Sequence, residues 1–269
     1  MESPIELGKA WALIRKDMRN WSSYKSSVFT SIAGAIIGAA SWGLLGTFNT
    51  ASVTEYNTNY VSFLVVGILM TNMMMPVISG TSNRLSPWSL ETILMTGIST
   101  PTYVLGTVGW GFIIAVIFTL PQFIISIILF PVILEINVIS FILAFAISFV
   151  IMFSLGMIST GVKLVTKVTD PITWFLIAAQ GLFAGMTFPV SHLDSILPGL
   201  STVSWFIPQT WIYHIIRLSL LSDGSLADAS VASAFLGATI IALILAPIGY
   251  YMFRWGLIRA KKEGNIGWY

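Results

Sequence analysis

The chain has 269 residues, of which 56% are hydrophobic and 9% are charged, and its mean hydropathy is +0.87. These values exclude a soluble globular domain, because such a composition cannot supply a water-facing surface of ordinary polarity. The net charge is only +2, and we expect no nucleic-acid partner. Cysteine is absent, which excludes disulfides, thiolate metal sites and thiol catalysis. We therefore expect an all-α integral membrane protein.

The segment 5–25 precedes the first long apolar run and lacks the features of a cleaved signal peptide. Its large apolar residues recur at spacings of 4, 3, 4 and 3, which places them on one stripe of a helix, with Lys9, Lys16 and Asn20 opposite. The stripe consists of Leu7, Trp11, Ile14, Met18 and Trp21. This pattern predicts an amphipathic helix at the level of the lipid headgroups. Docking of a soluble partner on the same stripe is an alternative, and both can hold.

A membrane-spanning helix needs about 20 predominantly apolar residues. Six such runs are present: Val28–Phe48, Tyr60–Ser79, Tyr103–Phe130, Val138–Thr160, Ile172–Phe188 and Val231–Phe253. No charged residue lies in the middle of any of them, which argues against a proton channel or a transporter that uses buried carboxylates. We expect the whole chain, 1–269, to form one transmembrane domain.

Cationic residues are distributed unevenly among the connecting segments. In a six-span topology, 12 of the 13 Lys and Arg residues lie on one side of the membrane and only Arg217 lies on the other. Loops that retain Lys and Arg are cytoplasmic. We therefore expect a multi-pass protein of the cell membrane with both termini in the cytoplasm.

The polar segment 80–101 lies between two predicted spans, on the cytoplasmic side. Ser86 suits a helix cap, Pro87 a first helical turn, and Glu91 the early turns, where the helix dipole favours an anion. Leu90, Ile93 and Leu94 then share one face. The sequence predicts either a short amphipathic helix parallel to the membrane or an ordinary interfacial loop.

The segment 189–221 is largely apolar, yet Pro198, Gly199 and Pro208 divide it into pieces too short to cross a bilayer. We expect a re-entrant helical hairpin on the extracellular side, packed within protein. A metal or proton-relay role for His192 and His214 is open, although no carboxylate lies at ligand spacing.

Four features together resemble the ABC-2 type permeases, the membrane subunits of ATP-driven exporters. Three are stretches of sequence: ELGKAWALIRKDMRNW at Glu6–Trp21, LSPWSLETILMTGISTPTYVLG at Leu85–Gly106 and FPVSHLDSILPGLSTVSWFIPQTW at Phe188–Trp211. They are similar to the family's connecting helix, its loop between spans two and three, and its passage between spans five and six. The Thr-Pro pair of the loop is displaced here to Thr100 and Pro101. The fourth feature is the six-span layout with both ends inside.

The resemblance implies an assembly of two permeases and two copies of a separate ATPase, which binds ATP and Mg. This chain itself would be no enzyme and would hold no cofactor or metal. The residues implied to contact the ATPase are Leu90, Glu91, Ile93, Leu94 and Thr96, together with Leu7, Trp11, Ile14 and Met18. The substrate path implied at the interface of a permease homodimer includes Phe63, Asn72, Met73, Phe175, Gln180 and Phe183. These side chains suit a hydrophobic or amphipathic cargo such as a drug, a lipid or a lipid-linked glycan.

Two other classes of function remain as alternatives. A transporter or channel that acts alone would need no ATPase. A membrane-embedded enzyme would need a nucleophile and base, or metal ligands, at membrane depth, and the sequence contains neither G-x-S-G nor H-E-x-x-H. ATP-dependent export is therefore the functional hypothesis that the sequence favours.

Overall fold

The computed structural model describes residues 6–49, 51–84, 97–166 and 171–262, and most of them are helical. Five of its helices are long and apolar enough to cross a membrane. They are α2 (Lys25–Thr47), α3 (Tyr60–Arg84), α5 (Thr100–Leu129), α6 (Val138–Thr166) and α10 (Ala229–Lys262). This architecture confirms a multi-pass, all-α membrane protein.

The run Ile172–Phe188, predicted as a span, forms a shorter helix than expected. Helix α7 (Pro171–Leu182) has 12 residues, a length of about 18 Å against a hydrocarbon core of about 30 Å. The prediction of one continuous helix was wrong after Leu182. Gly185 adopts a φ of +76°, a left-handed conformation that glycine accepts and an α-helix does not.

The segment 189–221 contains three short helical pieces: η2 (Val190–Ser195), α8 (Leu200–Ser204) and α9 (Pro208–Leu221). Gly199 has a φ of +87°, and Pro208 stands in the first turn of α9. The predicted breaks at Gly199 and Pro208 are therefore confirmed. The longest piece, α9, has 14 residues and extends for about 21 Å.

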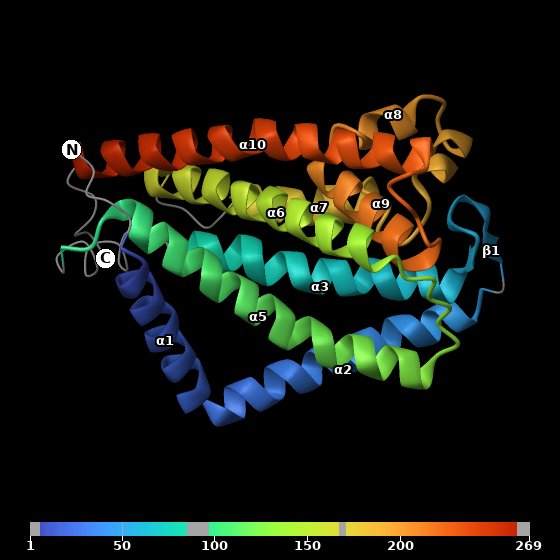
Figure 1. Ribbon diagram of the computed structural model, residues 1–269, viewed down its shortest axis with the longest axis horizontal. Coiled ribbons are helices and arrows are strands. Elements are labelled where there is room, and N and C mark those ends of the chain that lie inside the picture. The colour runs from blue at the N-terminus through green and yellow to red at the C-terminus, as the bar shows by residue number, and fades with distance from the viewer. Residues whose placement is uncertain (1–5, 50, 85–96, 167–170, 263–269) are drawn as a thin grey trace.

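Helix α3 lies at the centre of the bundle and packs against α2, α5, α6 and α9 (Figure 1). In its apolar window 78% of the residues are buried, whereas the other spanning helices reach at most 44%. Phe63, Met74 and Ile78 on α3 are completely buried. The remaining spanning helices leave apolar faces exposed, as expected of helices in contact with lipid, and α10 packs on the outer side of α6.

The predicted amphipathic helix is present as α1 (Leu7–Ser23), which packs along α5 and meets α2 at a sharp angle (Figure 1). Ala10 and Leu13 are buried, and the ring of Trp21 lies edge-on to Trp110 at 6.3 Å. Three members of the predicted stripe, Leu7, Trp11 and Met18, are exposed by 75%, 59% and 42%. One side of the apolar face of α1 therefore packs against α5, and the other side, with Leu7, Trp11 and Met18, remains exposed.

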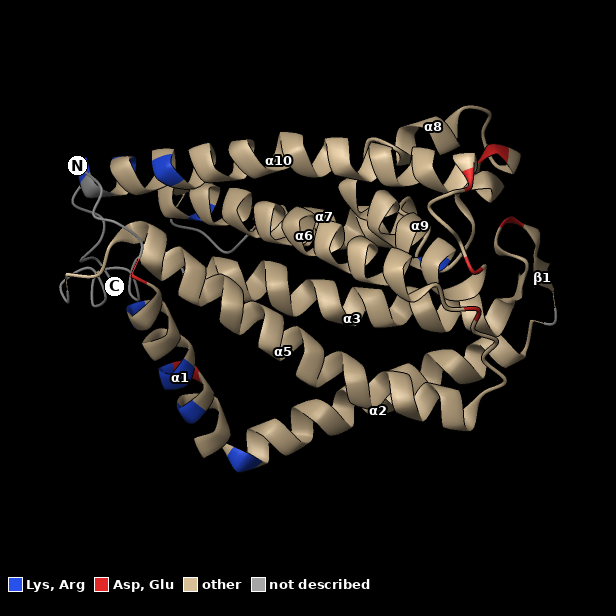
Figure 2. Cartoon of the chain, viewed as in Figure 1, with Lys and Arg blue, Asp and Glu red and all other residues tan. Residues whose placement is uncertain are grey.

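Charges of opposite sign gather at opposite ends of the bundle (Figure 2). The end that holds the start of α5 and the last turns of α6 and α10, with α1 beside it, carries most of the Lys and Arg and is called the basic end below. The opposite end, called the acidic end, carries Glu55, Glu135, Asp194, Asp223 and Asp228. Among the residues that the structure describes, one cation, Arg217 of α9, lies in the half of the molecule that holds these acids.

A small hairpin covers part of the acidic end. It consists of β1 (Ser52–Val53), the turn η1 (Thr54–Tyr56) and β2 (Thr58–Asn59), and its two strands pair in antiparallel register, with Val53 opposite Thr58. Asn57 adopts a φ of +47°, which asparagine tolerates better than most residues. The hairpin connects α2 to α3 and places Tyr56 against the core.

Helices α6 and α10 approach each other through glycines. A Cβ atom built on Gly256 would overlap the carbonyl oxygen of Gly161, and one built on Gly161 would overlap that of Met252. The backbones themselves are therefore in contact, as small residues allow in membrane bundles. By contrast, a Cβ atom at Gly34, Gly38 or Gly181 would meet nothing within 4 Å, so these glycines make no close helix contact among the described residues.

Candidate functional site

Arg217, the one cation expected on the extracellular side, is buried inside the protein with 2% of its surface exposed. It projects from α9 and donates hydrogen bonds to three backbone carbonyls. Nη1 binds the oxygen of Gly185 at 2.6 Å, and Nη2 binds those of Met186 at 2.7 Å and Phe63 at 3.2 Å. One side chain thus joins α9, α3 and the chain that follows α7.

Aromatic rings surround the same guanidinium group. Its central carbon lies 3.5 Å from the ring centroid of Phe63, 5.4 Å from that of Tyr213 and 5.9 Å from that of Tyr56. No carboxylate of the described residues forms an ion pair with it, and its Nε atom has no hydrogen-bond partner there. Carbonyl dipoles and ring faces therefore compensate this buried charge in place of an acid.

The sequence explains why carbonyl groups are available at this position. The helix α7 ends at Leu182, so the carbonyls of Gly185 and Met186 have no helical partner, and non-helical backbone at membrane depth must be satisfied within the protein. Gly67 on α3 leaves the room for this contact, because a Cβ atom there would overlap the oxygen of Met186. Arg217 therefore supplies hydrogen bonds to the non-helical backbone that follows α7.

A second polar group, formed by Tyr56, His214 and Glu55, lies beside Arg217 at the acidic end. The Tyr56 hydroxyl is 2.8 Å from Nδ1 of His214, and a carboxylate oxygen of Glu55 is 3.8 Å from the same nitrogen. Burial raises the pKa of Tyr56, so its hydroxyl stays protonated, and it is hydrogen-bonded to His214, which stays neutral because burial lowers its pKa. These contacts fix the hairpin between α2 and α3 against α9.

This neutral histidine makes the stability of the protein dependent on pH. Burial, and secondly the charge of Arg217, lower the pKa of His214 to about 4, although Glu55 acts in the opposite direction. Between pH 6.5 and 4 the unfolded chain binds a proton that the folded chain excludes, so the free energy of unfolding falls as the pH falls, by at most about 3 kcal/mol. We expect His214→Gln to flatten this slope in thermal melts of the detergent-solubilised protein.

His192 provides the matched control, because it is also at the acidic end but is exposed. The variant His192→Gln should keep the slope of the wild type between pH 6.5 and 4. An unchanged slope in His214→Gln would show that the buried imidazole is not the group that titrates.

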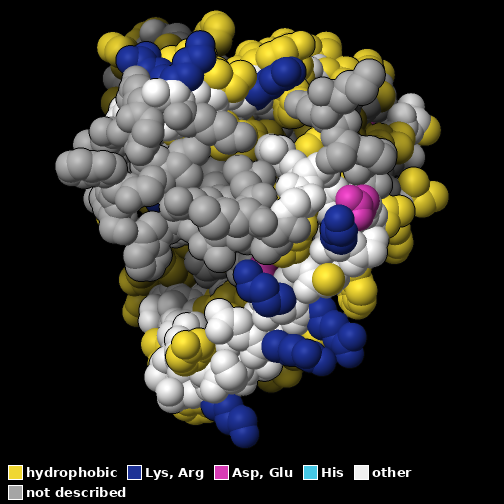
Figure 3. Space-filling model, turned by 90° about the vertical axis from the view of Figure 1, so that its left-hand side faces the viewer, with side chains coloured by type: hydrophobic (Ala, Val, Ile, Leu, Met, Phe, Trp, Pro, Cys, Tyr) yellow, Lys and Arg dark blue, Asp and Glu magenta, His cyan; other side chains and the backbone are white. Residues whose placement is uncertain are grey.

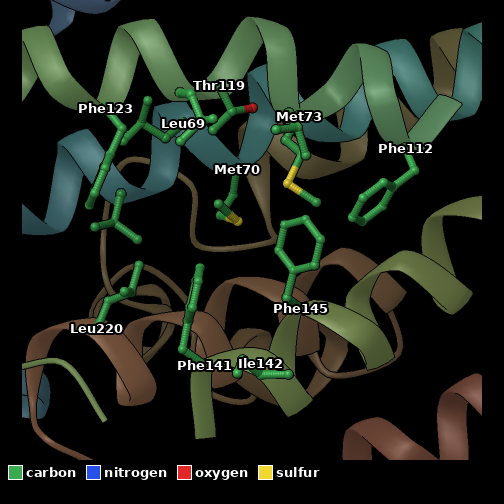
Figure 4. A pocket seen from close by; sticks show the side chains of 13 residues that line it. Leu69, Met70, Met73, Phe112, Thr119, Phe123, Phe141, Ile142, Phe145 and Leu220 are labelled. Carbon is green, nitrogen blue, oxygen red and sulfur yellow. The ribbon is translucent and has the colours of Figure 1, made fainter. Parts of the chain in front are cut away.

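An apolar cavity of about 360 Å³ lies between α3, α5 and α6 (Figure 4). Its floor comes from α3, with Leu69, Met70 and Met73, and its walls come from α5 and α6. The other lining residues are Val66, Phe112, Val116, Thr119, Leu120, Phe123, Phe141, Ile142, Phe145 and Leu220. Phe112 meets Phe145 and Phe149 edge-on, at 5.6 and 5.4 Å between ring centroids, and so connects α5 to α6 beside the cavity.

The structure does not gather the six residues predicted for a substrate path around one space. Only Met73 lines the apolar cavity. Phe63 contacts Arg217, Gln180 is 3.5 Å from the hydroxyl of Tyr213, and Asn72 donates to Gln122 at 2.5 Å. Phe175 is 71% exposed on α7, and Phe183 is partly buried. Phe63, Asn72 and Gln180 therefore have specific contacts inside this single chain. The substrate path implied at a homodimer interface stays a prediction.

The residues predicted to contact an ATPase fall into two groups. Leu90, Glu91, Ile93, Leu94 and Thr96 lie outside the described residues. The other four are on α1, where Ile14 is half-buried against Gly109 of α5 and Leu7, Trp11 and Met18 are exposed. Figure 3 looks onto the basic end of the molecule and shows Lys and Arg side chains at several places on it.

Sequence reasoning missed Arg217 as the organising residue of the acidic end. The sequence did contain one signal: Arg217 is the only one of the 13 Lys and Arg residues that the six-span topology places on the extracellular side. The two histidines lie apart from any metal-binding cluster: within the described ranges, no three His, Cys, Asp or Glu side chains are placed to hold an ion.

Comparisons of the sequence with protein families and with curated proteins return no match. The class of the protein is therefore inferred from its structure. The described helices define a multi-pass membrane protein with a charge-separated bundle.

Proposed function

We propose that this chain is the permease subunit of an ABC-2 type exporter, which moves a hydrophobic or amphipathic substrate out of the cell with ATP hydrolysed by a separate subunit. The observation that carries the proposal is the position of α1. The backbone N–H of Glu6, just before α1, donates to the hydroxyl of Thr102 in the first turn of α5 at 3.0 Å. The start of α1 and the first turn of α5, which follows the segment 80–101 in the chain, therefore lie together at the basic end, and this supports the proposal.

The course of the chain supports a topology with both termini on one side. The start of α1 and the end of α10 lie at the basic end (Figure 1), while α10 begins at the acidic end. Helix α6 ends at the basic end, so the chain between α6 and α10 must return to the acidic end. We assign this crossing to α7 together with the residues that follow it, which makes six crossings, with the basic end in the cytoplasm of a cell-membrane protein.

The proposed assembly contains two permeases and two ATPases, with ATP and Mg bound only by the ATPases. The exposed apolar side of α7, which includes Trp174 and Phe175 at 68% and 71% exposure, supports a contact with a second permease copy. A contact that transmits force needs a rigid base, because reversing a 1:99 conformational bias takes about 5.5 kcal/mol. The burial of Ala10 and Leu13 against α5 supplies such a base for α1.

Co-purification tests this proposal. A tagged chain, extracted from the membranes of its own host in mild detergent, should carry an ATP-hydrolysing subunit with it. The variants Glu91→Arg and Leu94→Asp should lose that subunit and the ATPase activity, because both alter the proposed contact surface. Glu135→Arg is the control, since it makes the same charge change on an exposed residue at the acidic end. Transport by the purified chain without nucleotide would instead establish a transporter that acts alone.

A further inference from the structure

We infer that the cavity between α3, α5 and α6 binds an acyl chain of a phospholipid from the membrane leaflet at the acidic end. The first argument is the chemistry of its walls. Twelve of the 13 lining residues are hydrophobic, and the remaining one, Thr119, contributes a hydroxyl without a hydrogen-bond partner among the described residues. The walls offer no charged partner to a polar ligand, so burying a polar group there would be costly.

The size of the cavity excludes a helix as its occupant. A volume of about 360 Å³ lies at the lower end of the range for small-molecule sites, whereas an α-helix with its side chains is about 10 Å wide. A hydrocarbon chain is narrow enough to enter between α5 and α6. The rim residues Leu120 and Ile142 are exposed by 52% and 64%, so the opening faces the surroundings of the bundle, which in a membrane are lipid chains.

The depth of the cavity indicates the leaflet. On α6 its residues lie three to seven positions after the first residue, Val138, or about 5–10 Å along the helix. On α5 they lie six to 17 positions before Leu129, or about 9–26 Å. Both helices reach the acidic end at these termini. A lipid with its headgroup at that surface can therefore extend one chain into the cavity.

Photocrosslinking can test this site in the purified chain, reconstituted without nucleotide in phosphatidylcholine vesicles that contain a phospholipid with a mid-chain diazirine. Bulk lipid should label residues by exposure, and this favours α10, where Leu236 and Leu243 are exposed by 64% and 68%, over α3, where Leu69 and Met73 are each exposed by 1%. An acyl chain bound in the cavity should reverse this order of labelling. We expect the peptide with Leu69–Met73 to carry several-fold more label than the peptide with Leu236–Leu243.

Substitutions at the rim make the test specific. Ile142→Trp places a large ring in the opening and should reduce labelling of Leu69–Met73 at least five-fold. Leu236→Trp is the matched control, because Leu236 has the same 64% exposure on α10, and it should leave that labelling unchanged. Val116→Trp fills the cavity from α5 and repeats the test if Ile142→Trp does not elute as a monodisperse protein.

Two results would overturn the inference: stronger labelling of α10 than of α3 in the wild type, or unchanged labelling of α3 in a folded rim variant. The inference does not depend on the proposed function. The vesicles contain neither ATP nor an ATPase, so failure of lipid labelling and failure of ATPase co-purification are separate outcomes.

Discussion

Replacement of Arg217 by methionine is expected to destabilise the protein strongly. Methionine fills most of the space but donates no hydrogen bond, so the carbonyls of Gly185 and Met186 lose their partner within the protein. A buried acceptor that is left without a hydrogen-bond partner costs about 1–3 kcal/mol, so the loss at two carbonyls is a large share of the 5–15 kcal/mol that stabilises a typical protein. Thermal unfolding in detergent should show a fall in Tm of roughly 10 °C.

Two further variants separate the role of the fork-shaped guanidinium from that of its charge. Arg217→Lys keeps the cation but cannot lie flat on the ring of Phe63 or reach three carbonyls in one plane, so we expect an intermediate Tm. Arg19→Met makes the same chemical change on an exposed position of α1 and should shift Tm by less than about 2 °C. A melt of Arg217→Met that overlays the wild type would show that the carbonyl contacts contribute little.

The loss of stability in Arg217→Met should affect the backbone near Arg217 more than the rest of the protein. Arg217 contacts residues 32 and 154 positions away in sequence, namely Gly185 in the chain after α7 and Phe63 on α3. When it is removed, the segment between α7 and η2 should exchange its amide hydrogens faster than the α6–α10 pair does. In an exporter that opens at the acidic end, this segment would form part of the outer opening, so its attachment to α9 would also influence the opening.

Sequence alone predicted the long helices well, and the reason is physical. A helix that crosses lipid must satisfy its own backbone over about 20 apolar residues, so hydropathy fixes its existence and most of its length. The third predicted span, Tyr103–Phe130, corresponds to α5 at Thr100–Leu129. The helix α1 was predicted from the spacing of its apolar residues. Like hydropathy, this spacing is a local property that depends only on residues within a few helical turns.

The site residues depend on contacts that no local pattern contains. Spanning helices are apolar on every side, so periodicity does not indicate which phenylalanine faces the core. Phe63 is completely buried on α3, whereas Phe175 is 71% exposed on α7, although the family resemblance implied that both lie along a substrate path. The sequence placed Arg217 on the extracellular side but did not show that its side chain is buried. Its partners are backbone carbonyls, which every residue has and which no sequence pattern reveals.

The second large effect is expected at the contact between α6 and α10. In Gly256→Leu the new side chain must occupy the position of the Gly161 carbonyl, and backbone cannot move aside as a flexible side chain can. The helices must separate, which also loosens Phe253 and Leu257, both buried in the same contact. Overpacking costs about 1–3 kcal/mol, and occasionally more; because backbone must move here, we expect a value at the upper end of this range and a corresponding fall in the melting temperature.

Gly34→Leu is the matched control and should change stability in the opposite direction. Nothing lies within 4 Å of a Cβ atom at Gly34, and leucine has a higher helix propensity than glycine by somewhat less than about 1 kcal/mol. Melts of both variants in the same detergent therefore test whether close backbone contact, and not glycine content as such, holds this bundle together. Equal melting temperatures for the two variants would contradict the close approach of α6 and α10, because only one of the two glycines has a neighbouring backbone to displace.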